Sequence, residues 1–347
     1  MKKVKASCMS SPFLYLSSMQ KPVIAFVTGG YSAEAEISYK SAITIEKNLD
    51  HSRYEVYRID ITPEEWFHPT ASGERVQVDK SDFSIQINGI KIQFDAVFIG
   101  IHGTPGEDGK LQGYFDLVGL PYTSCDATTS AITFNKRYTV AIAGAAGYHV
   151  AKSVHIFKHD YNSSKLNNLN YPVFVKPNNG GSSIGMSKVD EASSLEDAMQ
   201  KAFREDDQVL VEEYISGREF TIGVFKSGDE IITLPFTEIM TDNAFFDFEA
   251  KYQGKSKEET PANCSDEIAE KVRTAAKGIY AVFNCRGVVR MDFIYNQKAE
   301  QPYLLEINTV PGQSAASIVP QQVAAAGMVL KDFYSMLIED ALACKKN

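Results

Sequence analysis

The chain has 347 residues, of which 44% are hydrophobic and 23% are charged, and its formal net charge is −9. The length favours two or three packed domains, and the composition excludes a disordered or fibrous protein. Because the chain is acidic and has no long basic run, a nucleic-acid-binding surface is disfavoured, and small molecules are the expected partners.

The first 20 residues combine lysines with a short apolar stretch that serines and Pro12 interrupt. We expect a disordered leader or the product of an upstream start codon there, rather than a signal peptide. No other run approaches the ~20 apolar residues of a membrane span. The five scattered cysteines form no CxxC pair, so neither a disulfide framework nor a zinc site is supported. The expected location is a reducing cytoplasm, away from membranes.

The chain from Pro22 to about residue 61 predicts a strand, a loop, a helix and a second strand. The strands are the apolar run PVIAFVT and the run YEVYRIDI, and the loop between the first strand and the helix is GGYSAEAE. Ser32 is the expected N-cap of the helix, with Glu34 and Glu36 in its first turn, where the helix dipole favours acids.

Residues 84–93, SIQINGIKIQ, alternate about Asn88-Gly89 and predict a hairpin. The next run, DAVFIGIHG, predicts a buried strand that ends at His102. Residues 21–125 are therefore expected to form an α/β domain with ligand groups at the carboxyl ends of its strands, where GGYSAE and HGTPGEDG lie. GGYSAE lacks the GxGxxG spacing of a dinucleotide fold, so a tight turn without a ligand is the alternative.

Residues 126–211 predict a helical segment around Asn135 and Lys136, two strands joined by the loop PNNGGSSIGM, and the helix SSLEDAMQKAF. The loop can present backbone N–H groups to phosphate oxygens beside Lys176, which ends the first of these strands. It lacks the P-loop pattern GxxxxGK[ST], so it suggests a lid over a nucleotide, and an ordinary hairpin connection is the alternative. Lys136 could add a second positive charge, although a surface lysine is usually only solvated.

Residues 212–347 are predicted to be rich in strands, with the pairs EFTIGVF/EIITLPF and GVVRMDFIY/YLLEIN before an apolar helix near residues 328–342. Glu212 and Glu213 follow the apolar run VLV, and Glu219 begins another strand. Carboxylates in these positions could accept hydrogen bonds from the amino group or ribose of an adenosine. The alternative is that they are solvated charges at the edge of a sheet.

The hairpin VVRMDFIY/YLLEIN gives the most specific local signal. Because alternate side chains of a strand share a face, Arg290 and Asp292 point together, as do Glu306 and Asn308. Burying carboxylates on apolar strands costs several kcal/mol per charge without compensation. Two carboxylates and an amide oxygen suit magnesium. An internal ion pair between Arg290 and the acids is the alternative.

Seven motifs in order resemble the ATP-grasp superfamily, and specifically its D-alanine:D-alanine ligase branch. They are GGYSAEAEIS, HGTPGEDGKLQG, VKPNNGGSSIGM, EEYISGREFT, EAKYQGKSKEETPA, RMDF and LLEINTVPGQSAASIVP. The resemblance runs from about residue 22 to the C-terminus. It implies an α/β, or overall α+β, protein with a three-domain ATP-grasp fold. These domains would be an N-terminal Rossmann-like substrate-binding domain (21–125), a central subdomain with a glycine-rich lid (126–211) and a C-terminal subdomain with the metal site (212–347).

The resemblance also implies the reaction and its partners. ATP would phosphorylate the carboxylate of one D-alanine, and the amine of a second D-alanine would attack the acyl phosphate, in service of peptidoglycan precursor synthesis. ATP would act as cosubstrate with two magnesium ions, or manganese. The family further suggests a homodimer.

The resemblance assigns roles to individual residues by motif. Glu34 and His102 would hold the first D-alanine, and Ser317 would bind the carboxylate of the second. Arg290 and the backbone N–H of Gly312 would stabilise the tetrahedral oxyanion. The remaining roles are phosphate contacts by Lys136, Lys176 and Lys251; adenine and ribose contacts by Glu212, Ile215 and Glu219; metal binding by Asp292, Glu306 and Asn308; and a closing link of Glu34 with Ser182 and Tyr252 over the bound substrates.

Three positions depart from the family pattern, and other functions compete with the first. Gln313 and Ser314 stand where methionine and threonine are common, and Asp116 stands where glutamate is usual. A D-alanine:D-lactate ligase is the nearest alternative, but such relatives typically depart from the Lys251-Tyr252 loop that this chain keeps. Another ATP-grasp ligase would lack the SAE and HGTPGEDG pair, and a silent nucleotide-binding scaffold would not keep a competent residue at every charged motif position.

Overall fold

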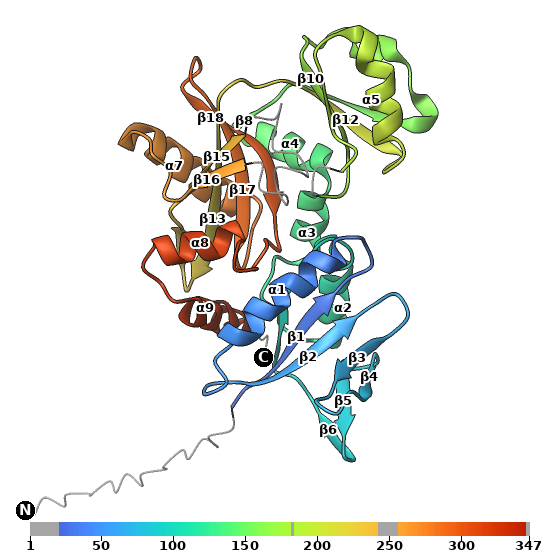
Figure 1. The fold of residues 1–347 in the computed structure, drawn as a ribbon, viewed down its shortest axis with the longest axis vertical. Coiled ribbons are helices and arrows are strands. Elements are labelled where there is room, and N and C mark those ends of the chain that lie inside the picture. Colours follow the sequence, from blue (N-terminus) through green and yellow to red (C-terminus); the bar gives the residue numbers. More distant parts are fainter. Residues whose placement is uncertain (1–20, 182–183, 242–255, 345–347) are drawn as a thin grey trace, which may run out of the picture.

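The computed structural model describes residues 21–181, 184–241 and 256–344. Three sheets form its framework: the first lies at the bottom of Figure 1, the second at the upper right and the third at the upper left. Within the described residues, no helix is long and apolar enough to cross a membrane. The predictions for Ser182, Lys251 and Tyr252 fall outside the described residues.

The first sheet has the strand order β6-β5-β4-β3-β2-β1-β7, and its central strand β1 runs parallel to both β2 and β7. Parallel neighbours bring their carboxyl ends to one edge, so the loops GGYSAE and HGTPGEDG meet there, as the sequence predicts. The predicted hairpin is confirmed as β5 and β6. The elements are β1 (Val23–Gly29), α1 (Ala35–Asn48), β2 (Glu55–Ile61), β3 (Trp66–Pro69), β4 (Arg75–Asp79), β5 (Ser84–Ile87), β6 (Ile90–Ile92), β7 (Ala96–Ile99) and α2 (Lys110–Val118).

Two predicted boundaries in this part are wrong. Helix α1 begins at Ala35 with Glu34 at the N-cap, not Ser32. Ser32 instead closes a turn before the helix, because its Oγ accepts from the Glu34 N–H and its carbonyl accepts from the Ala35 N–H. Strand β7 ends at Ile99, so His102 lies in the loop that follows the strand.

The second sheet is antiparallel, with the order β11-β10-β12-β9, and α5 packs against it (Figure 1). Strands β10 and β11 are the predicted pair on either side of the glycine-rich loop. The expected single helical segment is two helices, because Asn135 is extended and its side chain caps the second helix at the Tyr138 N–H. The elements are α3 (Ala127–Phe134), α4 (Lys136–Ala145), β9 (Ser153–Phe157), β10 (Val173–Pro177), β11 (Ser187–Val189), α5 (Leu195–Ala202) and β12 (Gln208–Glu213), with short 3-10 turns at Lys158–Asp160, Ser163–Leu166 and Ala192–Ser194.

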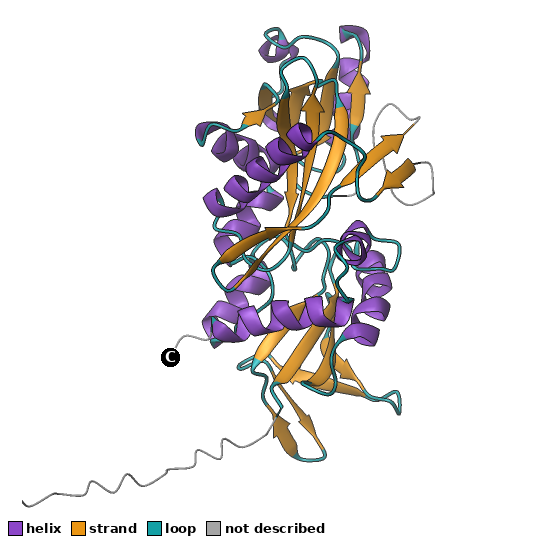
Figure 2. Ribbon diagram, turned by 90° about the vertical axis from the view of Figure 1, so that its left-hand side faces the viewer, coloured by secondary structure: helices purple, strands orange, loops and turns teal. Residues whose placement is uncertain are grey.

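The third sheet has the order β16-β15-β13-β17-β18-β8, with β14 paired to β13, so both predicted strand pairs are confirmed. Helix α7 packs on β13, β14, β17 and β18, and Figure 2 shows helices on one side of this sheet. The side chain of Ser265 caps α7, and two acids in the first turn complement its dipole. The elements are β8 (His149–Val150), β13 (Arg218–Ser227), β14 (Glu230–Thr233), β15 (Thr237–Thr241), β16 (Ser256–Glu259), α7 (Asp266–Val282), β17 (Val289–Asn296), β18 (Gln301–Asn308), α8 (Ile318–Ala325) and α9 (Leu330–Ala343).

One apolar cluster joins the first sheet to the C-terminal helix. Phe98 of β7 meets Tyr334 of α9 edge to face at a centroid distance of 5.4 Å, and Phe333 of α9 meets Phe225 of β13 at 5.1 Å. All four side chains are buried. Burying aromatic rings of this size stabilises a protein by about 1.5–3 kcal/mol each. Helix α9 therefore fixes the first and third sheets against each other on either side of the site.

Candidate functional site

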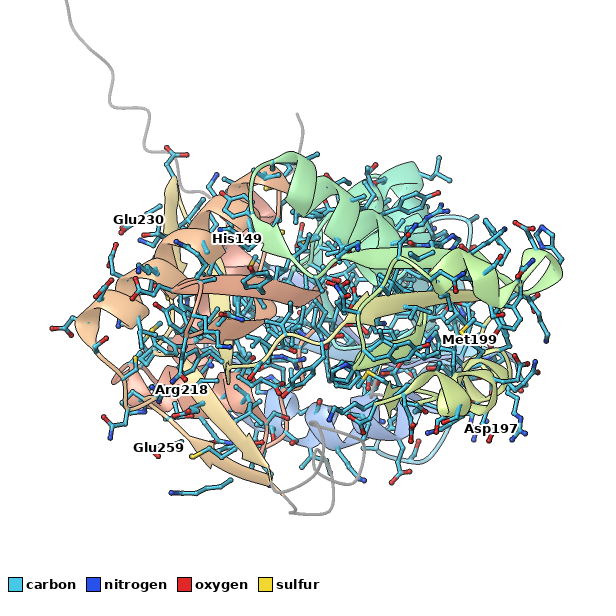
Figure 3. All side chains as sticks on the ribbon, turned by 90° about the horizontal axis from the view of Figure 1, so that it is seen from above. His149, Asp197, Met199, Arg218, Glu230 and Glu259 are labelled. Atoms are coloured by element: carbon cyan, nitrogen blue, oxygen red, sulfur yellow. The ribbon has the colours of Figure 1, made fainter. Side chains whose placement is uncertain are left out.

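Two adjoining cavities, of about 340 Å³ and 640 Å³, are lined by Glu34, which follows the first strand of the first sheet, by the glycine-rich loop and by strands of the third sheet. Strands of the second sheet also line the larger cavity. Glu34, Lys136 and Glu306 line both cavities, so the two spaces share a wall. Figure 3 looks down on the second sheet and shows Met199 of α5 on one side and Arg218 of the third sheet on the other. A ligand in the larger cavity would contact both sheets.

The predicted acidic hairpin lines these cavities, and its four polar residues are paired across the two strands. Asp292 lies opposite Glu306, and Arg290 lies opposite Asn308. The guanidinium of Arg290 donates to the two carboxylate oxygens of Asp292 at 3.0 and 2.9 Å and lies 3.5 Å from Glu306. The Thr221 hydroxyl also donates to Asp292. The ion pair that the sequence offered as an alternative is thus present, and it neutralises part of the acidic charge.

The donor set of the hairpin fits a hard divalent cation. The part of the chain that the structure describes holds no cluster of three or more His, Cys, Asp or Glu side chains with metal-ligand spacing. Magnesium does not require such a cage, because one or two carboxylates, water and substrate phosphates satisfy it. Asp292 and Glu306 supply the carboxylates, and the amide oxygen of Asn308 accepts from the Val310 N–H at 3.2 Å with one lone pair left over. The hairpin alone therefore makes a partial site that needs the phosphates of a ligand.

Lys176 and Glu212 face each other in the wall of the larger cavity. Strands β10 and β12 place them on neighbouring strands, where they form a buried ion pair. Their side chains are 10% and 6% exposed, so the ion pair lies in a medium of low dielectric constant. Ile215 and Glu219 line the same cavity. The lining of the larger cavity thus includes a cation, two carboxylates and an apolar side chain.

The start of the glycine-rich loop is held by a residue that the sequence analysis missed. One carboxylate oxygen of Asp206, in the turn before β12, accepts from the Asn179 backbone N–H at 2.8 Å and from its side chain at 2.7 Å. From the other side, Lys136 of α4 donates to the Gly180 carbonyl. The base of the loop is therefore fixed on two sides. No local sequence signal marks Asp206, because its partner lies 27 positions away.

Glu34 sits between two glycines from different parts of the chain. A Cβ at Gly103, which has φ +67°, would lie 2.4 Å from one Glu34 oxygen, and a Cβ at Gly181 would lie 2.7 Å from the other. Any other residue at either position would displace the carboxylate. The close approach explains why both the HG loop and the glycine-rich loop have glycine at these positions.

Burial shifts the pKa values of two groups near Glu34. The pKa of His102 is lowered to about 4, first by burial and then by the charge of Arg290. The pKa of Glu107 is raised by burial and by the neighbouring Glu34 carboxylate. Glu107 accepts from the backbone N–H groups of Gly103 and Val310, so it joins the HG loop to the segment after β18. Sequence reasoning missed Glu107, although it lies inside the HGTPGEDG motif.

The segment after β18 brings Gly312 and Ser317 to the smaller cavity. Ser317 occupies the N-cap position of α8, and its Oγ accepts from the Ser314 N–H at 3.0 Å. A Cβ at Gly312 would lie 2.8 Å from the Ser317 Oγ. A helix N-terminus beside a cavity is a favourable place for a carboxylate.

The described candidate residues all line one or both cavities, although their chemical roles rest on the resemblance. Those on the smaller cavity alone are His102, Arg290, Asn308, Gly312 and Ser317; those on the larger alone are Lys176, Glu212 and Ile215; and those on both are Glu34, Lys136, Glu219, Asp292 and Glu306.

Comparison with known proteins gives a consistent result along the chain. Residues 23–125 match the family model described as D-ala D-ala ligase N-terminus, and residues 142–339 match the one described as D-ala D-ala ligase C-terminus. The chain is 44% identical over 328 residues to the D-alanine–D-alanine ligase of Parabacteroides distasonis, covering 94% of this chain and 99% of that protein. It is 44% identical over 322 residues to that of Flavobacterium johnsoniae, covering 92% and 99%.

Solved structures resemble the whole fold. The VanG D-Ala:D-Ser ligase from Enterococcus faecalis superposes with a TM-score of 0.83 at 33% identity, covering 92% of this chain and 99% of that one. The D-alanine–D-alanine ligase from Bacillus anthracis complexed with ATP gives a TM-score of 0.75 at 27% identity, covering 93% and 98%.

Proposed function

The chain belongs to the D-alanine–D-alanine ligase family, which has the ATP-grasp fold, and we propose that it joins two molecules of D-alanine with the consumption of ATP. The product, D-alanyl-D-alanine, would serve peptidoglycan precursor synthesis. The observation that carries the proposal is the convergence of the acidic hairpin, the glycine-rich loop and Glu34 on two joined cavities.

The chemistry explains why two joined cavities are needed. A carboxylate is a poor electrophile, so its oxygen first attacks the terminal phosphorus of ATP, which forms an acyl phosphate and releases ADP. The amine of the second D-alanine then attacks the carbonyl carbon and loses a proton. The C–O bond to phosphate breaks, and inorganic phosphate leaves. Both steps require the substrates to be held in line and away from water.

The larger cavity suits ATP. Lys176 and Lys136 would contact the phosphates, together with Lys251, which lies outside the described residues. Glu212, Ile215 and Glu219 would hold adenine and ribose. ATP must separate part of the buried Lys176–Glu212 ion pair, so that the lysine turns to phosphate and the carboxylate to adenosine. Phosphate contacts of this kind stabilise charge in the transition state.

The acidic hairpin is proposed to hold two magnesium ions, or manganese, through Asp292, Glu306 and Asn308. Such ions would supply charge neutralisation for the transferred phosphoryl group. Arg290 already lies between the two carboxylates, so its guanidinium is positioned to share in stabilising negative charge next to them.

The smaller cavity suits the two amino acids. Glu34 would bind the ammonium of the first D-alanine beside His102, and Ser317 would bind the carboxylate of the second at the N-terminus of α8. Arg290 and the Gly312 N–H would stabilise the tetrahedral oxyanion. The family link of Glu34 with Ser182 and Tyr252 would close the site, and both partners of Glu34 lie outside the described residues.

Four broader proposals, on oligomeric state, location, domain bounds and residues 1–20, are based on membership of the family. The chain would act as a homodimer, and it would work in the cytoplasm, where ATP is available. Its domains would be 21–125, 126–211 and 212–347, with residues 1–20 as a leader. Strand β12 runs through Glu213, so the second division would fall inside a strand.

Release of ADP and phosphate in the presence of magnesium tests the proposed function. We expect turnover with D-alanine and none with L-alanine. D-Lactate or D-serine added beside D-alanine should not replace it in the product, which mass spectrometry identifies. A dipeptide from L-alanine, a mixed product in preference to D-alanyl-D-alanine, or ATP hydrolysis without ligation would contradict the proposal.

A further inference from the structure

A closed ring of hydrogen bonds surrounds His102 and joins the first sheet to the segment after β18. Ser41 of α1 lies 2.9 Å from His102 Nε2, and the other ring nitrogen, Nδ1, lies 2.7 Å from the Val310 carbonyl oxygen. The backbone N–H of Gln313 donates to the same Ser41 Oγ at 3.1 Å. The ring therefore leaves the segment at Val310 and returns to it at Gln313, with Gly312 between these two anchors.

The direction of each bond in this ring can be assigned. A carbonyl oxygen only accepts, so Nδ1 of His102 must carry a proton. Burial lowers the pKa of His102 to about 4, so the ring is neutral near pH 7 and Nε2 has no proton. Ser41 must then donate to Nε2 while it accepts from Gln313. A hydroxyl has one donor and two acceptor positions, so both bonds of Ser41 are satisfied.

Helix α1 forms a second hydrogen bond with His102. The His102 backbone N–H donates to the Ser38 hydroxyl at 2.9 Å, and Ser38 lies three residues before Ser41 on the same helix face. Ser38, Ser41 and Gln313 are all buried. If one of these hydrogen bonds is removed, bulk water cannot reach the remaining donor or acceptor to replace it.

The position that departs from the family pattern belongs to the same network. The Gln313 side chain accepts from the buried Tyr334 hydroxyl at 3.1 Å and donates to the Pro311 carbonyl at 3.2 Å. The turn that carries Gly312 is thus tied to α1 through its backbone and to α9 through its side chain. A methionine at this position could not donate to the Pro311 carbonyl, and its thioether sulfur would be only a weak acceptor for the Tyr334 hydroxyl.

We propose that Ser41 is a positioning residue: its hydroxyl holds the His102 ring through Nε2, while the Val310 carbonyl fixes the Nδ1–H tautomer, and it holds the Val310–Gln313 turn so that Gly312 stays at the smaller cavity. The proposal rests on the proposed function for the role of Gly312. It also has a chemical consequence, because neither ring nitrogen is available to take a proton from the attacking amine. His102 then serves as a fixed connector, and a different group must accept that proton.

The first test measures the tautomer directly. In wild-type protein labelled with ¹⁵N-histidine, long-range ¹H–¹⁵N correlation spectra distinguish the two neutral tautomers, and His102→Asn identifies the His102 signal among the six histidines. We expect the Nδ1–H form with no titration between pH 6 and 8. An Nε2–H form, or titration near the ordinary histidine pKa of about 6.5, would overturn the proposal. This result does not depend on which reaction the protein catalyses.

The second test measures catalysis in Ser41→Ala, Ser41→Cys and the matched control Ser84→Ala. Ser84 is also buried, but its hydroxyl donates to Asp82, and Ser84 lines neither cavity. We expect kcat to fall about tenfold or more in Ser41→Ala, which corresponds to the loss of one oriented interaction, while KM for ATP stays within about twofold. Ser41→Cys, which keeps a weak donor, should recover part of kcat, and Ser84→Ala should keep all of it.

Two results separate the possible failures. If Ser41→Ala matches Ser84→Ala in kcat, or if the Nε2 signal of His102 does not change in Ser41→Ala, the positioning role is wrong. If wild-type protein forms no dipeptide from D-alanine, the proposed function is wrong, and the tautomer measurement still decides the hydrogen-bond assignment. If Ser41→Ala fails to fold, the wild-type spectrum tests the hydrogen-bond assignment, and kcat of Ser41→Cys tests the positioning role.

Discussion

Replacing Arg290 by glutamine should separate the structural and chemical roles of the acidic hairpin. The guanidinium contacts Asp292 through two nitrogens and Glu306 through one, and the three side chains are 16%, 12% and 30% exposed. Removing one partner of a buried ion pair costs about 3–5 kcal/mol, because the remaining charge stays buried. Glu306 is screened in part by water, so we expect the lower end, about 3 kcal/mol.

Magnesium should reverse part of this loss. A ligand present at about 100 times its Kd stabilises the folded state by about 2.7 kcal/mol. In Arg290→Gln the carboxylates no longer have the guanidinium as a competing partner, so the metal should stabilise the variant at least as much as the wild type. The free energy of unfolding in urea, followed by circular dichroism in the presence of ATP, with and without magnesium, measures both effects.

Arg53→Gln is the matched control, because Arg53 also pairs with a carboxylate but both side chains are about half exposed. Surface pairs of this kind contribute about 0–1 kcal/mol. If Arg290→Gln is as stable as Arg53→Gln, the ion pair does not hold the hairpin as reasoned. If magnesium, with ATP present to supply the phosphates, stabilises neither the wild type nor Arg290→Gln, the hairpin is a structural ion pair and the metal assignment is refuted.

Three further predictions concern the site. Glu306→Gln should lower ADP production by orders of magnitude through weakened metal binding, measured against the exposed Glu230→Gln; near-normal turnover would contradict the assignment. Gly103→Ala should raise KM for D-alanine far more than Gly89→Ala, since both glycines have positive φ but only Gly103 would push a Cβ against Glu34; equal KM values would exclude that contact. Folding lowers the pKa of His102 from 6.5 to about 4. The neutral, buried His102 therefore makes its full contribution to the free energy of unfolding above pH 6.5, and this contribution is lost as the pH falls towards 4. The stability difference between wild type and His102→Asn should shrink by about 3 kcal/mol over that range in urea titrations, and a pH-independent difference would refute the shift.

The shared face of the polar residues in the acidic hairpin could be predicted because strand alternation is a local rule. Each strand places its polar residues two positions apart, and the short polar turn between the strands leaves few alternative pairings. The structure pairs Asp292 with Glu306, which is consistent with a shared face, and it adds a bulge after Asp292 that no local pattern indicated. The glycine-rich loop between β10 and β11 was predictable for the same reason.

The connections that hold the site could not be predicted in this way. Asp206 accepts hydrogen bonds from Asn179, and Ser41 accepts one from Gln313, which lies 272 residues away in the sequence. Neither contact therefore has a local sequence signature. The Ser32 cap was wrong because a serine before an acidic segment can close a turn as readily as it can cap a helix. The break at Asn135 carried a usable signal, since asparagine is a preferred N-cap residue.

The fate of the carboxylate oxygen tests the central claim, that this site activates one amino acid by phosphorylation. D-Alanine labelled with ¹⁸O in its carboxylate is incubated with the protein, ATP and magnesium, and the released phosphate is examined by ³¹P NMR. An acyl phosphate transfers one ¹⁸O atom to phosphate for each dipeptide formed. Unlabelled phosphate in the presence of dipeptide formation would contradict the account.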